Sequence, residues 1–458
     1  MRRLRQLAER TPPSRERYAD LLRALAITLV VLGHWIISVI GRDQAGHPTG
    51  HSALGDLPWA WPLTWGVQVM PVFFLVGGYA NAAALTSWRS RGGDATGWLI
   101  DRSSRLIRPT TALLVVLAAG SAVARLRGVD AAEIRTVVWF ATIPLWFLVA
   151  YLVVAPLTPV MYALHRRAGL VVPLVLVGLV ALGDLGRILG PDRLATGNYL
   201  FGWLAVHQLG FAWYDARRAS QASGRGDGDR PGLRRRRLPT SRHAGAVLLL
   251  VGLVALVLLT RVGPYPVAML NVPGERLDNT APPSLALLAA ATAQLGLILL
   301  LQNPARRWLH RRGPWQAVIA VNAVVLTVFL WHLTAAVLLV GLLDALGTLP
   351  TPQGATAAWW AWRVPWLLAL AVVLAALVAV FGPIEARTRR HAPASTAGPV
   401  RTALVAIGYA GPVAGLLMNS LTGKTAPEPL GLPAPALVAY LAGAGVLRLL
   451  RSGWGSRG

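Results

Sequence analysis

Twelve apolar segments of membrane-spanning length alternate with short polar loops, and this alternation is what most constrains the fold. A hydrocarbon core about 30 Å thick needs roughly 20 residues of helix. Only 14% of the residues are charged, whereas soluble domains carry about 25%. The sequence therefore predicts an all-α, polytopic transmembrane helical bundle. The predicted spans lie at about 21–40, 64–86, 110–125, 136–162, 169–187, 195–215, 244–261, 284–302, 317–343, 364–382, 401–418 and 434–450.

Basic residues fall mainly in alternate loops, which predicts an orientation. If the N-terminus is inside, inside segments hold about three basic residues for each one outside, as the positive-inside rule expects. Both termini are therefore expected to be cytoplasmic, in a multi-pass protein of the cell membrane. The longest inside loop, 216–243, is rich in Arg and Gly and is expected to be a solvated linker against anionic lipid. Because the net charge of +25 lies in such loops, no nucleic-acid partner is predicted.

No metal or thiol chemistry is expected. The chain contains no cysteine, which excludes disulfides and thiolate ligands. His47 and His51 are four residues apart in the outside loop 41–63, but Pro48 and Gly50 lie between them and argue against a helical metal site. This loop is predicted to be flexible and polar.

The first predicted span carries ionisable side chains at an unusual spacing. Arg23 and His34 are eleven residues apart, which returns a helix to within about 20° of the same face and separates the two residues by about 16 Å. Asp20 lies near the same face. Ionisable residues within a membrane are costly and are usually functional, so His34, Arg23 and Asp20 are the first candidates for a site.

Two motifs in the first two spans resemble the acyltransferase-3 family of integral-membrane acyltransferases. Residues 17–23, with ten residues between Arg23 and His34, resemble the family's Arg or Lys followed at this distance by a histidine. Residues 70–79 resemble its Phe-Phe-x-x-Ser-Gly-Tyr element. Gly77 stands in place of the serine, so a role for that hydroxyl does not carry over to this chain.

Two further motifs follow in the family's order. Arg102 and Arg105 before Pro109 resemble an Arg-x-x-Arg pair, for which Arg105 and Arg108 are the alternative. Residues 145–148 match a Trp-Phe-Leu signature in a middle span. The family core has about ten spans, so the resemblance implies a core over 1–390 that includes the loop 216–243. Residues 391–458 would then be a two-span C-terminal extension.

The resemblance implies transfer of an acyl group, often acetyl, from acyl-CoA to a hydroxyl of a cell-surface or secreted acceptor such as a glycan or glycolipid. Acyl-CoA would be a co-substrate, with no resident cofactor. His34, in an apolar wall that favours neutral imidazole, is expected to be the base or the acyl carrier. Arg23, with Asp20 beside it at the cytoplasmic mouth, is expected to face the donor.

Arginine binds phosphate with two parallel hydrogen bonds, so Arg102, Arg105 and Arg108 are expected to hold the phosphates of acyl-CoA. Tyr79 and Asn81, just past Gly78, are expected near the substrate because glycine allows close approach. Other polar residues within the spans are expected mainly to join helices, with cavity lining as the alternative; for Asp184, that alternative includes orienting His34. These residues are Asp184, His207, Gln208, Asn322 and His332.

A second class of protein fits the same outline. Twelve spans with both termini inside and a long loop after the sixth are typical of major-facilitator transporters. The halves of this chain show no convincing similarity to each other, and residues 88–94 imitate that superfamily's loop motif only loosely. CoA release that depends on His34 would indicate the enzyme, whereas uptake without CoA release would indicate the transporter.

Overall fold

Helices make up almost all of the computed structural model, which describes residues 15–44, 46–223, 238–386 and 398–452. Within these ranges, ten helices are long and apolar enough to cross a membrane. The number is eleven if the bent pair α6 (Ala131–Thr142) and α7 (Leu145–Val154), which meet at 54°, forms one broken span. The prediction of a helical, polytopic membrane protein is therefore confirmed.

Among the described residues, fewer helices meet this criterion than the twelve predicted spans. The segment at 195–215 forms α10 (Asn198–Ser223), which is not among the apolar helices. Its polar residues His207, Gln208 and Asp215 explain why. The segment at 317–343 is divided at Val324 into α13 (Arg312–Ala323) and α14 (Val325–Ala345).

The chain divides into two compact units, each built from separated stretches of sequence. Unit 1 comprises Met1–Val30, Ser52–Ala84 and Val154–Asn322, and unit 2 comprises Val31–His51, Leu85–Val153 and Ala323–Gly458. The first helix, α2 (Arg17–Ile37), contributes to both units, as does α4 (Met70–Arg89). The other helices of unit 1 are α3 (Thr64–Val67), α8 (Thr158–Ala168), α9 (Val171–Leu189), α10, α11 (Arg242–Arg261), α12 (Leu285–Leu309) and α13. Those of unit 2 are α5 (Ala95–Leu126), α6, α7, α14, α15 (Ala357–Ala386), α16 (Pro399–Leu421) and α17 (Ala434–Arg451).

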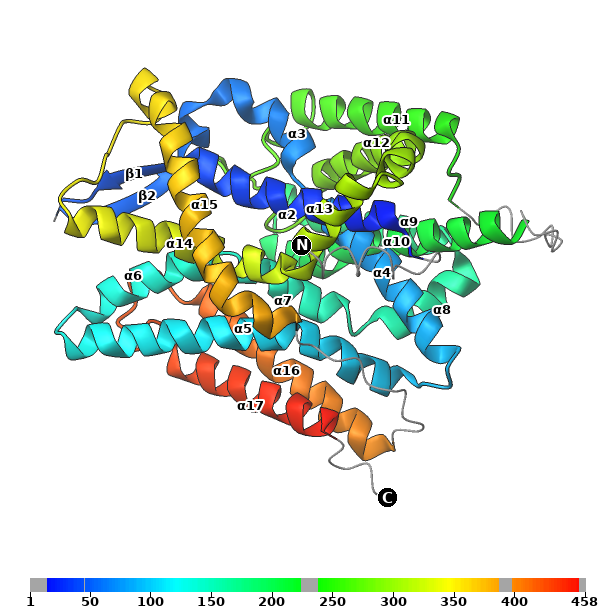
Figure 1. The fold of residues 1–458 in the computed structure, drawn as a ribbon. Coiled ribbons are helices and arrows are strands. Elements are labelled where there is room, and N and C mark those ends of the chain that lie inside the picture. Colours follow the sequence, from blue (N-terminus) through cyan, green and yellow to red (C-terminus); the bar gives the residue numbers. More distant parts are fainter. Residues whose placement is uncertain (1–14, 45, 224–237, 387–397, 453–458) are drawn as a thin grey trace. The chain divides into compact units, whose positions relative to one another are not determined.

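Small residues allow close helix packing within unit 1. The helices α11 and α12 lie side by side (Figure 1), and a Cβ on Gly296 would come within 2.3 Å of the Leu249 nitrogen. At the crossing of α4 and α10, a Cβ on Gly78 would lie 2.1 Å from the His207 carbonyl oxygen, and one on Gly210 would lie 2.2 Å from that of Leu75. Backbones in contact at glycine are typical of helix pairs in membranes.

In unit 2, the C-terminal helices α16 and α17 form a pair that packs on α5 (Figure 1). The hydroxyl of Tyr409 donates to the Leu99 carbonyl at 3.0 Å, and that of Tyr440 donates to the Ile107 carbonyl at 3.1 Å. Arg135 of α6 is fully buried and donates to carbonyls at the end of α16 and in the loop that follows. This arginine therefore satisfies backbone acceptors that the end of a helix leaves unpaired.

The described residues of the loop 41–63 form regular structure, contrary to the prediction of a flexible polar loop. It contains a hairpin of β1 (Ser38–Arg42) and β2 (Pro48–Ser52), followed by short 3₁₀ helices over Ala53–Asp56 and Pro58–Leu63. The two strands pair through their backbones, and the Leu54 nitrogen donates to the Ser52 hydroxyl. Hydropathy gives no sign of either interaction. Half of the predicted loop 216–243, residues 224–237, lies outside the described residues, and residues 216–223 are the last residues of α10. The predicted domain boundary at 390 also lies outside the described residues.

Helices α11 and α15 present mostly uncovered apolar side chains. Only 17% of the most apolar window of each is buried within the protein. Leucine and valine side chains remain exposed along both helices, including Leu250, Val254, Leu368 and Val372. Such faces are suited to lipid contact.

Candidate functional site

The three predicted catalytic residues lie on one helix. The helix α2 is unbroken from Arg17 to Ile37, so Asp20 lies in its first turn, Arg23 follows, and His34 lies in its last turn. The rise of 1.5 Å per residue places Arg23 and His34 about 16 Å apart along the axis. The expected arrangement on a single helix is therefore present.

The imidazole of His34 contacts a second imidazole from α14. His34 Nδ1 and His332 Nε2 are 3.3 Å apart, and the ring centroids are 5.1 Å apart at 42°. His34 is half-buried, whereas His332 is fully buried. The sequence predicts His332 mainly as a helix–helix partner, with cavity lining as the alternative, and its contact with His34 makes it part of the candidate site. Its position in an apolar span was the only sequence signal.

The backbone determines which nitrogen of His332 carries a proton. His332 Nδ1 is 2.6 Å from the carbonyl oxygen of Phe329, which can only accept, so Nδ1 must donate. With both imidazoles neutral, His332 Nε2 is then an acceptor and His34 Nδ1 donates to it. His34 Nε2 keeps its lone pair. This is the tautomer that a general base or a nucleophile requires.

The two histidine helices are also fixed by neighbouring contacts. Trp35 is buried, and its indole nitrogen donates to the His332 carbonyl at 3.0 Å. At the start of α14, Glu385 of α15 accepts from the backbone nitrogens of Leu326 at 3.2 Å and Thr327 at 2.8 Å. A carboxylate at a helix N-terminus satisfies orphan donors and complements the helix dipole.

The arginines predicted to bind the donor lie within α5 and not before it. The helix begins at Ala95, capped by Asp94, whose side chain accepts from the Gly97 nitrogen at 2.7 Å. Steps of three residues rotate the side chains by about 60° each, so the arginines spread over about 120° of the helix. Arg102 is half-buried, and Arg105 and Arg108 are exposed.

A continuous series of contacts within unit 2 links Arg102 to the histidine pair. Arg102 donates to the Tyr151 hydroxyl at 3.0 Å. The Tyr151 ring lies 6.0 Å from that of Phe147, which meets Phe329 edge-on at 5.5 Å. Phe329 in turn supplies the carbonyl that orients His332. Phe147 belongs to the Trp-Phe-Leu signature, so these contacts give that motif a physical role.

In unit 1, Asp20 and Arg23 belong to a charged cluster near the start of α2. Asp20 is buried and accepts from Arg15 at 2.5 Å, and Arg23 lies 3.6 Å from it. Glu16 pairs with Arg217 at 3.3 Å and with Arg306 at 3.1 Å. Arginines outnumber acids in this cluster, which suits the binding of an anion.

Tyr79 and Asn81 also lie in unit 1. The amide nitrogen of Asn81 is 3.1 Å from His207 Nε2, and both residues are fully buried beside the Gly78–Gly210 crossing. The ring of Tyr79 packs against those of Trp213 at 4.8 Å and Tyr214 at 5.5 Å. Arg102, Arg105 and Arg108 belong to unit 2, so the predicted donor-binding residues are divided between the two units.

Other polar residues in the spans join helices, as the sequence analysis favoured. The oxygens of Asp184 accept from Asn198 at 3.0 Å, from Tyr265 at 2.8 Å and from the Leu285 nitrogen at 2.8 Å. Asn322 donates to the carbonyl of Asp20 at 2.9 Å.

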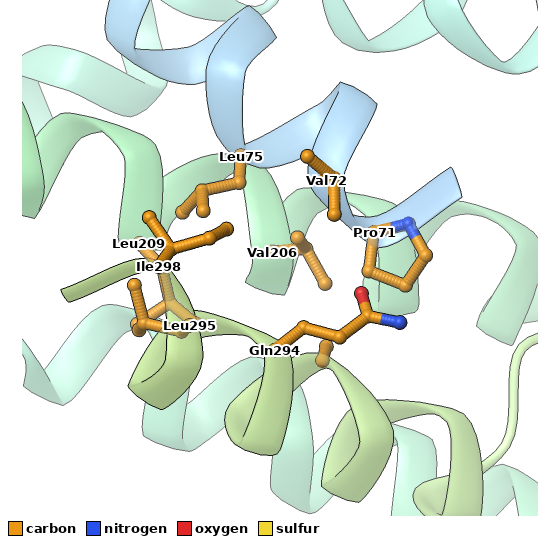
Figure 2. A pocket seen from close by; sticks show the side chains of 9 residues that line it. Pro71, Val72, Leu75, Val206, Leu209, Gln294, Leu295 and Ile298 are labelled. Atoms are coloured by element: carbon orange, nitrogen blue, oxygen red, sulfur yellow. The ribbon is translucent and has the colours of Figure 1, made fainter. Parts of the chain in front are cut away.

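Figure 2 shows a small apolar crevice in unit 1, lined by α4, α10 and α12. Its empty volume is about 190 Å³, but its gaps are too narrow to admit a water molecule. Gln294 is its one polar side chain among the described residues, and this amide donates to the backbone carbonyls of Trp65 and Gln68. The crevice is therefore packing space between helices.

The fold and the site together define a polytopic membrane protein with an oriented histidine pair. A family model described as an acyltransferase domain matches residues 16–382. The chain therefore belongs to the acyltransferase-3 family and is an acyltransferase, as the resemblance predicted. No curated protein and no solved structure matches the chain.

Proposed function

We propose that this membrane acyltransferase moves an acyl group, acetyl among the candidates, from acyl-CoA to a hydroxyl of a cell-surface or secreted glycan or glycolipid. The observation that carries the mechanism is the contact between His34 and His332, because it leaves a lone pair on His34 Nε2. Acyl-CoA is a co-substrate in this proposal, and no metal takes part.

The reaction needs one proton acceptor and one leaving group. In direct transfer, His34 Nε2 takes the acceptor hydroxyl proton while its oxygen attacks the thioester carbonyl. The C–S bond breaks, an ester C–O bond forms, and the proton passes to the CoA thiolate. In the covalent alternative, His34 Nε2 attacks the thioester carbonyl, the C–S bond breaks and CoA leaves as a thiolate. The acceptor hydroxyl then attacks the acyl-imidazolium, the acyl–nitrogen bond breaks as the ester C–O bond forms, and the hydroxyl proton neutralises the thiolate.

The cationic side chains are proposed to hold the donor. Arg102, Arg105 and Arg108 would bind its phosphates, and Arg23 would face the pantetheine arm on its way to His34. Tyr79 and Asn81 are retained as donor-binding residues on the grounds of the family motif beside them. With both termini cytoplasmic, the donor would enter from the cytosol and the acceptor from the opposite side or from the lipid.

The test uses the purified full chain and acetyl-CoA as the probe. Because the chain contains no cysteine, a thiol reagent reports only released CoA. We expect His34→Ala to lower CoA release at least about 10²-fold, the lower range of general base catalysis. His310→Ala, a change at an exposed histidine, is the matched control and should retain activity. Full CoA release by His34→Ala, or substrate uptake without CoA release, would refute the proposal.

A further inference from the structure

Arg363 of α15 holds the end of the helix that carries His34. Its side chain is only 6% exposed. One terminal nitrogen, Nη1, donates to the carbonyl of Ser38 at 2.8 Å and to those of Trp35 and Ile36 at 3.4 Å. A helix ends with carbonyls that have no partner inside the helix, and α2 ends at Ile37. Arg363 satisfies them in a buried setting.

The guanidinium is itself fixed within α15. Its Nε donates to the Trp359 carbonyl at 3.2 Å, and its carbon lies 4.5 Å from the centre of the Trp359 ring. The indole nitrogen of Trp359 donates to the same Ser38 carbonyl at 3.4 Å. Arg363 and Trp359, one helix turn apart, therefore both donate to the Ser38 carbonyl, where α2 ends and β1 begins. A positive charge there also complements the C-terminal end of the α2 dipole.

Trp35 connects this contact to the histidine pair. Its carbonyl accepts from Arg363, and its indole donates to the carbonyl of His332. His34 is the preceding residue, so a change in the last turn of α2 moves its imidazole relative to His332. We infer that Arg363 is a positioning residue for the acyl-transfer reaction, which fixes the last turn of α2 so that His34 meets His332. This inference rests on the proposed role of His34.

Removal of the Arg363 side chain should lower kcat and leave the KM for acetyl-CoA nearly unchanged. Without Arg363, the carbonyls of Trp35, Ile36 and Ser38 each lose a charged donor. Weaker donors remain, the Ser38 hydroxyl for Trp35 and the Trp359 indole for Ser38, so the last turn of α2 can relax. A displacement of about 1 Å at a reacting group costs up to about 10²-fold in rate. We expect Arg363→Gln to lower kcat for CoA release about 10- to 100-fold, with the KM for acetyl-CoA within about twofold of the parent. Arg363→Lys, which restores a charged donor without the planar fork, should recover part of this loss.

The matched control is Arg135→Gln. Arg135 is also a buried arginine of unit 2 that donates to helix-terminal carbonyls, but it serves α16. Both variants should lose thermal stability, whereas only Arg363→Gln should lose turnover in the folded, monodisperse fraction. Equal losses of kcat in the two variants, or a raised KM with normal kcat, would overturn the inference.

A double variant separates positioning from general stability. If Arg363 acts through the histidine pair, Arg363→Gln should cost less than about threefold in kcat when His332 is already Phe, because the contact it protects is gone. Full additivity of the two changes would overturn the inference. If His34→Ala keeps full activity, the proposed function fails; if His34→Ala is inactive and Arg363→Gln is normal, only the positioning inference fails.

Discussion

At the scale of single residues, the candidate site depends on hydrogen bonds whose direction can be assigned. The Phe329 carbonyl can only accept, which makes His332 the acceptor for His34 when both rings are neutral. The sequence predicted His34 because an ionisable residue shared a helix face with Arg23. It did not predict the partner, because the contact joins residues 298 positions apart and has no periodic signal.

Substitutions at His332 test this hydrogen bond. His332→Phe keeps a ring but removes the acceptor, so we expect kcat for CoA release to fall about 10²-fold with an unchanged KM for acetyl-CoA. His332→Gln offers an amide oxygen near the former Nε2 and should lose distinctly less. Steady-state kinetics on the two purified variants provide the comparison. Equal activity of the two variants would contradict the assigned hydrogen bond.

At the scale of elements, length and hydropathy predicted most helices, but their ends followed local chemistry. The helix α5 starts at Ala95, well before the predicted span, because Asp94 caps it and the arginines extend it beyond its apolar part. The hairpin at 38–52 was missed because backbone pairing between short polar strands leaves little trace in hydropathy. Close crossings were partly predictable, since paired glycines such as Gly77 and Gly78 indicate backbone contact.

The α4–α10 crossing gives a prediction at this scale. Gly78→Ala places a methyl group 2.1 Å from a backbone oxygen, which cannot move aside as a flexible side chain can. We expect a loss of about 1–3 kcal/mol, the usual cost of overpacking, or failure to accumulate. Gly178→Ala in α9 is the control, because its added methyl group meets nothing within 4 Å. Thermal unfolding in detergent measures both, and an unchanged midpoint for Gly78→Ala would contradict the close crossing.

At the scale of the whole molecule, the number of crossings decides the orientation of the ends. Ten or twelve crossings place both termini on one side, whereas eleven place them on opposite sides. The count depends on whether α6 and α7 form one broken span and whether α10 crosses. With 26 residues, α10 is about 39 Å long at 1.5 Å per residue, which is sufficient to cross despite its polar residues.

Reporter fusions test the orientation. We expect a fluorescent reporter that folds only in the cytoplasm to be active at both termini, because arginine is concentrated in the segments assigned to the inside. A phosphatase that is active only outside should report from an insertion at 272–276, between α11 and α12. Activity of the fluorescent reporter at only one terminus would exclude an even number of crossings with cytoplasmic ends.

The proton on His332 Nδ1 is set by an oxygen of the main chain. No codon change at position 329 can delete that oxygen, since every amino acid brings the same carbonyl. Laboratory evolution of this enzyme can therefore alter the basicity of His34 through the imidazole partner or the surrounding helices. The direction of the hydrogen bond from His34 to His332 is fixed by the helical backbone.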